Sequence, residues 1–351
     1  MDKEETVTLS DGAGGEKMQS FICRLVLSNL DSSAGEIPLG YLDDGAVIDD
    51  IVFTTDSYTV KPLIFPGGNI GSLSVCGTVN DLSVMGAEPI ALSCSLIISD
   101  GFSLKDLDVI LKSMREASDR AGVPVVTGDT KVVEKTALEG MFINTSGIGR
   151  RSDLLDSNIE AICARREFAQ RWPNDSAVAP GDKIIISGTL GDHGIALLSF
   201  REGYGFETQV KTDAQPLNHM IREALRVGGI SAMKDPTRGG LSNLLNEWSQ
   251  KSKVGIILEE DDVPLKEPVV SACEMLGIDP LEIGNEGKAA FAVVPDLAED
   301  VLAALRKTDE GRDAAIIGEA SRDYRGVVMR TSVGGLRIVE SPVGDPVPRI
   351  C

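Results

Sequence analysis

Hydrophobic residues in the first 150 positions follow two spacings, one typical of strands and one typical of helices. Short apolar runs at 52–55 and 90–99 have the length of strands. Between them, apolar residues recur at helical spacing from Ile70 to Met85, and Gly86 would end that helix. This half is also expected to contain a helix from Ser103 to Gly122 and strands at 123–127 and 138–148. The pattern predicts one α+β or α/β domain over residues 1–150.

The alternation of strands and helices restarts after an interruption. Residues 151–181 are polar, lack periodicity and include two prolines, so we expect an irregular linker there. From 182 to 339, predicted strands such as 183–187 alternate with helices such as 240–251, which indicates a second α/β domain. Residues 340–351 are expected to form a tail.

Cys351 is the last residue of this tail, and packing hardly explains a thiol at that position. Pro342, Pro346 and Pro348 favour an extended spacer, and at roughly 3 Å per residue the tail could reach about 30 Å. We therefore expect the tail to stay out of any core and to carry the thiol into a pocket of this or another protein. The alternative is a frayed end whose cysteine has no role. A prenylation signal is excluded, because nothing follows the cysteine.

The composition indicates a globular, acidic chain. It has 351 residues, 42% of them hydrophobic, which suits about two domains. The formal net charge of −20 opposes binding to nucleic acid or anionic membranes, so a polyphosphate ligand would have to arrive with a metal ion. Neither a membrane-spanning run nor a signal-peptide pattern is found, and we expect a cytoplasmic protein. The six cysteines are too scattered for a zinc site or a disulfide framework.

Aspartates stand on turns or after predicted strands throughout the first domain. A hard cation such as Mg²⁺ takes oxygen ligands and bridges nucleotide phosphates to a few carboxylates. A single aspartate beside glycine is usually a turn residue, but several such positions in one domain favour a metal–triphosphate site. The positions are Asp43, Asp44, Asp56, Asp81 and Asp129.

Two glycine clusters could bring backbone N–H groups against phosphate, although each could equally be a tight turn. The first spans 11–15, and the second, at 235–240, opens the helix predicted at 240–251. The sequence has no GxxxxGK[ST] motif, and no GxGxxG motif follows a strand. A bound ATP would therefore be held without a Walker loop or a Rossmann turn.

Lys131 and Glu286 are the better candidates for proton transfer. Each lies in a short polar motif beside glycine within an apolar, strand-rich region, and the alternative is two charges on the surface. The only histidines, His193 and His219, have no serine or cysteine partner in a recognisable catalytic motif. We expect them to be structural, with His193 at most lining a pocket.

Taken together, the motifs along essentially the whole chain resemble those of the HypE family of hydrogenase maturation factors. The Asp-Asp, Asn-Asp and Gly-Asp motifs among them are shared with a wider ATP-binding superfamily. That superfamily includes aminoimidazole ribonucleotide (AIR) synthetase, thiamine-monophosphate kinase and selenophosphate synthetase. The Pro-Arg-Ile-Cys ending at 348–351 is what singles out HypE. The other motifs are LDDGAV at 42–47, TD at 55–56, NDLSVMGA at 80–87, VTGDTKV at 126–132, FINT at 142–145, SGTLGDHG at 187–194, KDPTRGGL at 234–241 and GNEGK at 284–288.

The resemblance implies a two-domain α+β, AIR-synthase-like (PurM-like) fold with a flexible C-terminal tail. It also implies a homodimer whose N-terminal domains pair, with ATP sites at the interface. The implied activity is that of an ATP-dependent carbamoyl dehydratase. A HypF-like carbamoyltransferase loads Cys351, and the carbamoyl group is dehydrated to a thiocyanate. The cyanide then passes to iron on a HypC–HypD complex for [NiFe]-hydrogenase.

The resemblance also assigns roles to residues. Cys351 would carry the substrate covalently, and Lys131 and Glu286 would transfer protons. ATP and Mg²⁺ would be held by Asp44, Asp56, Asn80, Asp81, Gly128, Asp129 and Asp235. Among these, the metal ligands would be Asp44, Asp81 and Asp129.

Two departures from the family pattern and two alternatives stay open at this point. Asp11 stands where the family often has histidine, and the segment at 157–181 is longer than usual.

A small-molecule kinase or a selenophosphate-synthetase-like enzyme of the same superfamily would not need Cys351. A non-enzymatic thiol carrier would keep the tail but hydrolyse no ATP.

Overall fold

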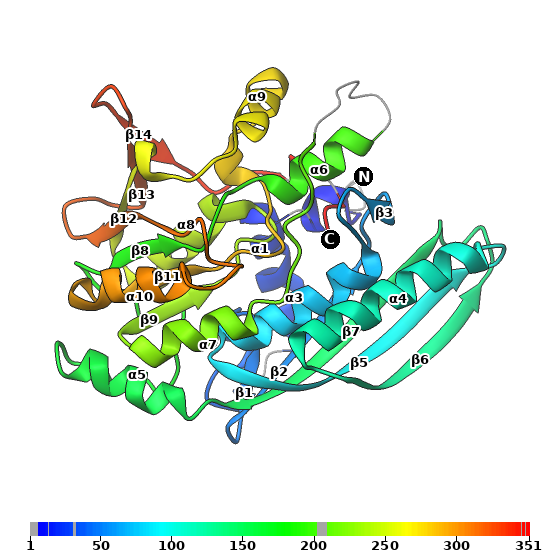
Figure 1. The fold of residues 1–351 in the computed structure, drawn as a ribbon, viewed down its shortest axis with the longest axis horizontal. Helices are drawn as coiled ribbons and strands as arrows, with labels where there is room; N and C mark the ends of the chain where they lie inside the picture. The colour runs from blue at the N-terminus through cyan, green and yellow to red at the C-terminus, as the bar shows by residue number, and fades with distance from the viewer. Residues whose placement is uncertain (1–5, 13, 31–32, 202–208, 345, 348) are drawn as a thin grey trace, which may run out of the picture.

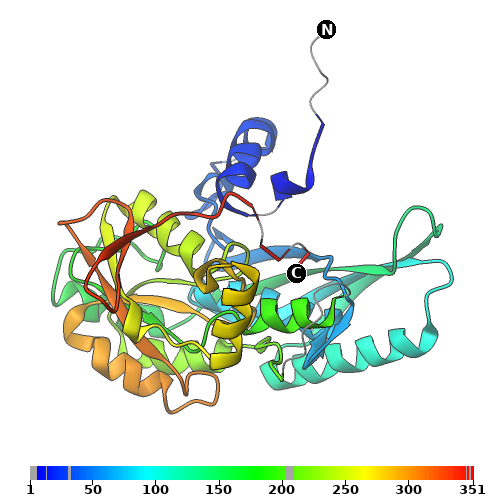
Figure 2. The ribbon, with the colours of Figure 1, turned by 90° about the horizontal axis from the view of Figure 1, so that it is seen from above.

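A computed structural model describes residues 6–12, 14–30, 33–201, 209–344, 346–347 and 349–351. Two domains, each built of a sheet and helices, lie side by side, and a helical arm near the N-terminus stands apart from them (Figures 1 and 2). The arm contains η1 (Leu9–Gly12), α1 (Gly15–Phe21), η2 (Ile22–Leu27) and α2 (Ser28–Leu30), and η3 (Leu39–Tyr41) follows it.

The first domain is a five-stranded sheet in the order β1-β2-β7-β5-β6, in which only β5 and β6 run parallel. Helices α3 (Ile70–Val84) and α4 (Leu104–Ala121) cover one face of it (Figure 1). β6 is an edge strand. The strands are β1 (Ala46–Ile48), β2 (Ile51–Tyr58), β5 (Ala87–Ser99), β6 (Val125–Val133) and β7 (Met141–Arg151), with a small hairpin of β3 (Ile64–Phe65) and β4 (Gly68–Asn69).

The two helices of this domain form where the sequence predicted them. In α4 the Ser103 hydroxyl accepts a hydrogen bond from the Asp106 backbone N–H, and Gly122 ends the helix in the left-handed conformation. In α3 the Asn69 side chain caps the first turn, in a capping box with Ser72. α3 is buried on nearly every side, because it packs against the first sheet and also contacts the second domain.

The second domain is a seven-stranded sheet in the order β14-β13-β10-β12-β8-β11-β9. Its strands are β8 (Lys183–Ile186), β9 (Ile230–Lys234), β10 (Gly255–Glu259), β11 (Ala290–Val293), β12 (Ala315–Ser321), β13 (Val327–Arg330) and β14 (Leu336–Val339). Its helices are α6 (Asp192–Phe200), α7 (Asn218–Val227), α8 (Gly240–Ser252), α9 (Glu267–Leu276) and α10 (Ala298–Leu305), with single turns η4 (Glu260–Asp262), η5 (Pro280–Glu282) and η6 (Pro295–Leu297).

Successive side chains along the strands of the second sheet point to opposite faces, so the core lies in two layers, one on each face of the sheet. Ile184 and Ile186 of β8 belong to the cluster that includes Trp248 of α8, whereas Ile185 between them faces the other cluster. That other cluster runs without a break into the core of the first domain. The two domains therefore share apolar packing, and α3 lies where they meet.

The expectation of an irregular linker at 151–181 is wrong for residues 154–163, whereas residues 164–181 have no helix or strand. Residues Leu154–Cys163 form helix α5, which buries Leu155 and Ile162. The buried Asn158 side chain exchanges two hydrogen bonds of 2.8 Å with the backbone of Ile230, the first residue of β9. Leu155, Ile159 and Ile162 do have helical spacing, but the helix is short and the polar residues around it obscured this signal.

The expectation that the tail stays out of any core is also wrong for its last residues. Val347 and Ile350 are buried, with exposed fractions of 0% and 2%. The end of the chain lies between the two domains (Figure 2). Two positions of the predicted spacer, 345 and Pro348, lie outside the described residues.

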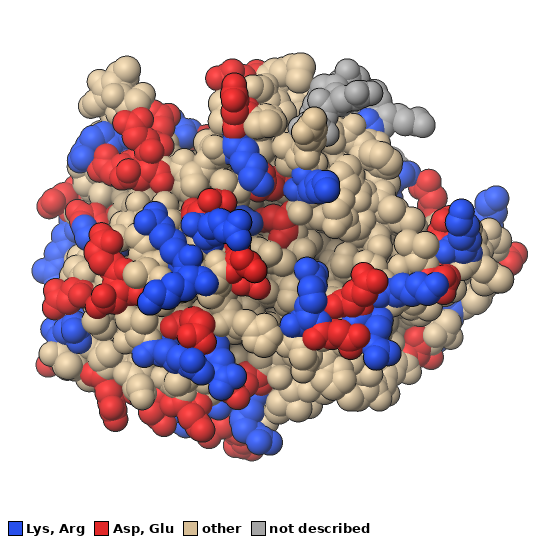
Figure 3. Space-filling view, viewed as in Figure 1, with Lys and Arg blue, Asp and Glu red and all other residues tan. Residues whose placement is uncertain are grey.

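Acidic and basic side chains are interspersed over the face of the molecule in Figure 3, and that face has no extended basic stripe. Among the described residues, no helix is both long and apolar enough to cross a membrane.

Candidate active site

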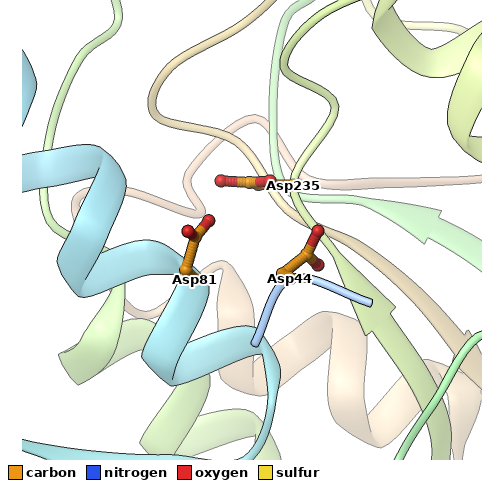
Figure 4. A group of neighbouring side chains, drawn as sticks. All are labelled: Asp44, Asp81 and Asp235. Carbon is orange, nitrogen blue, oxygen red and sulfur yellow. The ribbon is translucent and has the colours of Figure 1, made fainter. Parts of the chain in front are cut away.

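Three aspartates from different segments, of which Asp235 is buried and Asp44 and Asp81 are half-buried, meet between the domains (Figure 4). Asp44 precedes β1, Asp81 lies on α3 and Asp235 follows β9. One carboxylate oxygen from each lies within 4.8 Å of the others. Burial, followed by repulsion from neighbouring carboxylates, raises the pKa of Asp81 and of Asp235 well above the ordinary value. A divalent cation would relieve both the repulsion and the cost of burial.

Asp56 lies beside this cluster. Its carboxylate accepts a hydrogen bond of 3.1 Å from the Tyr58 hydroxyl, and its charge contributes to the raised pKa of Asp81. Asp81 in turn accepts a hydrogen bond of 2.8 Å from Thr54. The structure therefore brings together Asp44, Asp56, Asp81 and Asp235 of the residues that the sequence proposed for nucleotide and metal.

A buried lysine supports the cluster from the second domain. Lys234 Nζ lies 3.2 Å from Asp44 Oδ1, 3.1 Å from Asp175 Oδ2 and 3.2 Å from Glu247 Oε2. Burial raises the pKa of Asp44 to about 6, and Lys234 opposes that rise. Burial also opposes the charge on Asp175, but Lys234 and Lys251 outweigh it and hold the pKa of that carboxyl below its usual range.

Lys251 extends the network to a second aspartate of the loop before β1. Its Nζ lies 2.6 Å from Asp175 Oδ2 and 3.0 Å from Asp43 Oδ1. Burial and the Asp175 charge raise the pKa of Asp43 to about 7, and Asp43 Oδ2 has no hydrogen-bond partner among the described residues. The network fixes the loop that carries Asp44 against α8.

The cluster opens into a cleft of about 280 Å³. Both glycine clusters predicted from the sequence line it, through Gly14 and Gly15 on one side and the start of α8 at Gly240 on the other. Gly240 must be a glycine there, because a Cβ atom would lie 2.4 Å from the Leu281 carbonyl oxygen. The first turn of α8 therefore lines the cleft beside the carboxylates, and the N-terminus of a helix favours anions.

The C-terminal thiol lies next to this cleft. Arg238, which also lines the cleft, donates a hydrogen bond of 3.2 Å from Nε to Cys351 Sγ. Burial raises the pKa of the Cys351 thiol to about 12, although Arg238 lowers it, so the docked sulfur is protonated at neutral pH. The tail therefore delivers the sulfur to the edge of the carboxylate cluster.

Glu286 stands close enough to the thiol for its charge to contribute to the raised pKa of Cys351. Its exposed fraction is 3%, and its Oε1 has no hydrogen-bond partner among the described residues. Burial, then the charges of Asp235 and Asp213, raise the pKa of Glu286 well above its usual range. A carboxyl in this setting can exchange a proton with a group held on the sulfur.

Asn80 has a different place from the one expected for a nucleotide ligand. Its side chain donates to the carbonyls of Gln215 at 3.1 Å and Glu286 at 3.2 Å, and accepts from the Leu217 N–H at 2.8 Å. Its hydrogen-bonding capacity is thus engaged by backbone of the second domain. Asn80 positions the segment that carries Glu286.

Asp129 and Lys131 are not brought to the cluster within one chain. Both lie on edge strand β6, are mostly exposed, and pair with each other at 3.4 Å. Register aligns Asp129 with Ser95 of β5, whereas the neighbouring Cys94 is buried on the helix-covered side. Alternation then places Asp129 on the sheet face opposite α3. Gly128 is needed for strand pairing, since a Cβ atom there would lie 2.0 Å from the Cys94 carbonyl oxygen.

Sequence reasoning missed several residues of this site. Asp175 lies in the segment expected to be a linker, and no motif surrounds it. Lys251 resembles any other charged residue on a helix, so nothing in the sequence distinguishes it. Arg238 lies inside the KDPTRGGL motif, where its cationic side chain was a usable signal. His193, expected to be structural or to line a pocket, contacts the docked tail through Ile350. Asp11 is bonded locally to Thr8, and we assign it no role.

Comparison with known proteins first defines the class. The family model for the N-terminal domain of AIR synthase related proteins matches residues 42–151, and the model for the C-terminal domain matches residues 179–330. Thiamine monophosphate kinase from Aquifex aeolicus shares the fold, with a TM-score of 0.61 at 17% identity. Fold and family models therefore define a two-domain AIR synthase related protein.

More similar relatives define the branch. A putative hydrogenase expression/formation protein of Methanocaldococcus jannaschii is 48% identical over 98% of this chain and 99% of its own. Carbamoyl dehydratase HypE of Escherichia coli is 38% identical, again over 98% and 99%. A crystal structure of HypE in complex with ATP has a TM-score of 0.78 at 40% identity and covers 99% of this chain and 100% of its own. The chain belongs to the HypE family.

Proposed function

We propose that this protein is an ATP-dependent carbamoyl dehydratase that converts a carbamoyl group on Cys351 to a thiocyanate, which supplies cyanide for the iron of [NiFe]-hydrogenase. The observation that carries the proposal is the docked thiol. Cys351 Sγ lies 3.2 Å from Arg238 Nε, and Arg238 lines the same cleft as Asp44 and Asp235. A substrate held on that sulfur would face the phosphate-binding side of the cleft.

The reaction needs phosphate transfer and then elimination. An amide oxygen is a poor leaving group, so phosphorylation of the carbamoyl oxygen by ATP makes phosphate the leaving group. The C≡N bond forms as phosphate departs and the nitrogen protons are removed, which leaves ADP and phosphate as co-products. We assign proton removal at nitrogen to Glu286, whose Oε1 is free among the described residues.

Asp44, Asp81 and Asp235 fit Mg²⁺ by the chemistry of their oxygen donors and by their spacing within 4.8 Å. When bound, Mg²⁺ supplies charge neutralisation to phosphate oxygens. Asp56, beside the cluster, would complete the acidic wall, while Gly14, Gly15 and the start of α8 would bind phosphate through backbone N–H groups.

We further propose a homodimer in which Asp129 and Lys131 act on the site of the second copy. The open sheet face, on which Asp129 and Lys131 lie, exposes apolar side chains that include Phe53, Ile97 and Ile148, and an apolar face of this kind favours a protein partner. Pairing these faces would bring Asp129 and Lys131 toward the other copy, which resolves their separation from the cluster within one chain.

A mixture of Lys131→Ala and Cys351→Ala chains tests this arrangement. If Lys131 acts across the interface, a mixed dimer has one complete site, and an equal random mixture should recover about a quarter of the wild-type sites. Each variant alone should be inactive. No recovery in the mixture, with dimer exchange shown by mass, would place Lys131 and Cys351 of one chain in the same site.

A chain in a crystal structure of a HypE–HypF complex has a TM-score of 0.83 to this protein at 42% identity, covering 92% of this chain and 100% of its own. We propose by this similarity that a HypF-like carbamoyltransferase loads Cys351, and that a HypC–HypD complex receives the cyanide. We expect loading to take place on the released tail, because docking holds the thiol against Arg238 between the domains and burial raises its pKa to about 12.

Phosphate release from the carbamoylated protein tests the function against its alternatives. The dehydratase should release one phosphate per carbamoylated Cys351 and almost none from unmodified protein. A small-molecule kinase would turn over ATP with a free substrate regardless of Cys351→Ala. A thiol carrier would release no phosphate in either form, and either of these results would overturn the proposal.

A further inference from the structure

The last residues of the docked tail are held through their backbone. The Cys351 carbonyl oxygen accepts from the Thr59 N–H at 3.1 Å and from its hydroxyl at 3.2 Å. The Arg349 carbonyl accepts from the Lys61 N–H at 3.2 Å and from Arg201 Nη2 at 3.0 Å. These donors come from both domains, so the docked tail bridges them.

His193 of α6 makes the contact between these two anchor points. Its Nε2 lies 2.9 Å from the Ile350 carbonyl oxygen, and its Nδ1 lies 2.7 Å from Thr212 Oγ1. A carbonyl only accepts, so Nε2 must carry the proton, and in a neutral ring Nδ1 then accepts from the Thr212 hydroxyl. Burial lowers the pKa of His193, which keeps the ring in this neutral form at neutral pH.

The surroundings of His193 hold the ring in one orientation. The side chain is fully buried, and the Phe65 ring meets it edge to face with centroids 5.5 Å apart. Gly194, the next residue, packs closely on its surroundings: a Cβ atom there would lie 2.3 Å from Ile283, and it would also contact the tail, at 3.3 Å from Val347 and 3.5 Å from Ile350. The imidazole and the adjoining glycine thus form one receptor for the peptide group and side chain of Ile350.

We propose that His193 is a positioning residue that latches the tail by its Ile350 carbonyl and so sets the balance between the docked and released thiol. Among the side chains that hold the tail backbone, His193 acts on the residue directly before Cys351. Fixing that peptide group fixes the direction in which Cys351 leaves the backbone, and hence the contact of its sulfur with Arg238. The consequence for dehydration rests on the proposed function, whereas the consequence for thiol exposure does not.

Alkylation of Cys351 by iodoacetamide tests the latch without using catalysis. Cys23 and Cys163 are exposed and would be replaced by serine, after which the terminal peptide is followed by mass spectrometry. His193→Leu should react about five- to tenfold faster at Cys351, the change expected from losing one buried hydrogen bond. His193→Gln, whose amide can still donate to Ile350, should restore much of the protection. His219→Gln changes an exposed histidine and should react at the wild-type rate.

The dehydration rate then separates the latch from the function. In the His193→Leu variant, carbamoyl acceptance should be kept while dehydration slows by a similar factor. Unchanged alkylation in a folded His193→Leu protein would overturn the latch even if dehydration is normal, which would leave the proposed function standing. If that variant does not fold, Thr212→Val removes the partner of Nδ1 and should give a smaller increase in alkylation; no increase would also overturn the latch.

Discussion

Substituting Asp81 by asparagine should make the ligand-free protein more stable and weaken its binding of Mg·ATP. The change removes one of three carboxylates, half-buried or buried, whose oxygens lie within 4.8 Å of one another. Two unit charges at that separation repel by roughly 3 kcal/mol at an effective dielectric constant of about 20. Asparagine keeps an acceptor for the 2.8 Å hydrogen bond from Thr54, so little is lost in exchange.

We expect the free energy of unfolding without ligand to rise by about 1–3 kcal/mol, since protonation already relieves part of the repulsion in the wild type. Affinity for Mg·ATP should fall at least about tenfold, because even residues behind metal ligands usually matter that much. Chemical denaturation measures the first quantity and isothermal calorimetry the second. The matched control is Asp108→Asn, which changes an exposed aspartate paired with Lys112 on α4.

The opposite signs make this test decisive. If Asp81 served mainly to stabilise the fold, its substitution would lower the free energy of unfolding. If it had no role in binding the ligand, its substitution would leave the affinity for Mg·ATP unchanged. A less stable Asp81→Asn protein with wild-type affinity would therefore refute the reasoning about the cluster.

Three further outcomes follow from the site. Cys351→Ala should fold and bind ATP but form no thiocyanate, which intact-mass spectra would show; a carbamoyl adduct on this variant would contradict the assignment. Glu286→Gln should accept carbamoyl and bind ATP but lose roughly 10²–10⁴-fold in thiocyanate formation in single-turnover assays, and a wild-type rate would make the residue structural. Asp43 and Asp44 have folded pKa values of about 7 and about 6, above their ordinary value, so the metal-free protein binds more protons than its unfolded chain and should gain stability as pH falls from 7 to 5. Denaturation curves that lose stability over this range would contradict the last of these.

The sequence predicted those elements whose signals are local. Helix α4 follows from its apolar spacing, from Ser103 at its start and from Gly122 at its end, and all three are read within one segment. Asp44 and Asp81 were proposed together because acidic turns repeat along one domain. Asp235 was proposed for the cofactor rather than for the metal, since its place in the cluster depends on how the second domain packs on α3.

Features that depend on contacts between distant segments could not be predicted in this way. Asp175 is a buried centre of the charge network because Lys234 and Lys251 reach it, yet its own neighbours are polar. The burial of Ile350 depends on a receptor built around His193, which proline content does not reveal. The outward direction of Asp129 depends on strand register, where a shift of one residue exchanges the two sheet faces.

The central claim is that Cys351 carries the group that is dehydrated. The most direct measurement is mass spectrometry of the C-terminal peptide after a single turnover, starting from protein carbamoylated by a HypF-like enzyme and given Mg·ATP. We predict that the carbamoyl adduct on Cys351 disappears as a cyano adduct appears on the same sulfur, and that Glu286→Gln retains the carbamoyl form. Loss of the carbamoyl group as free thiol, with no cyano adduct at any time, would contradict the account.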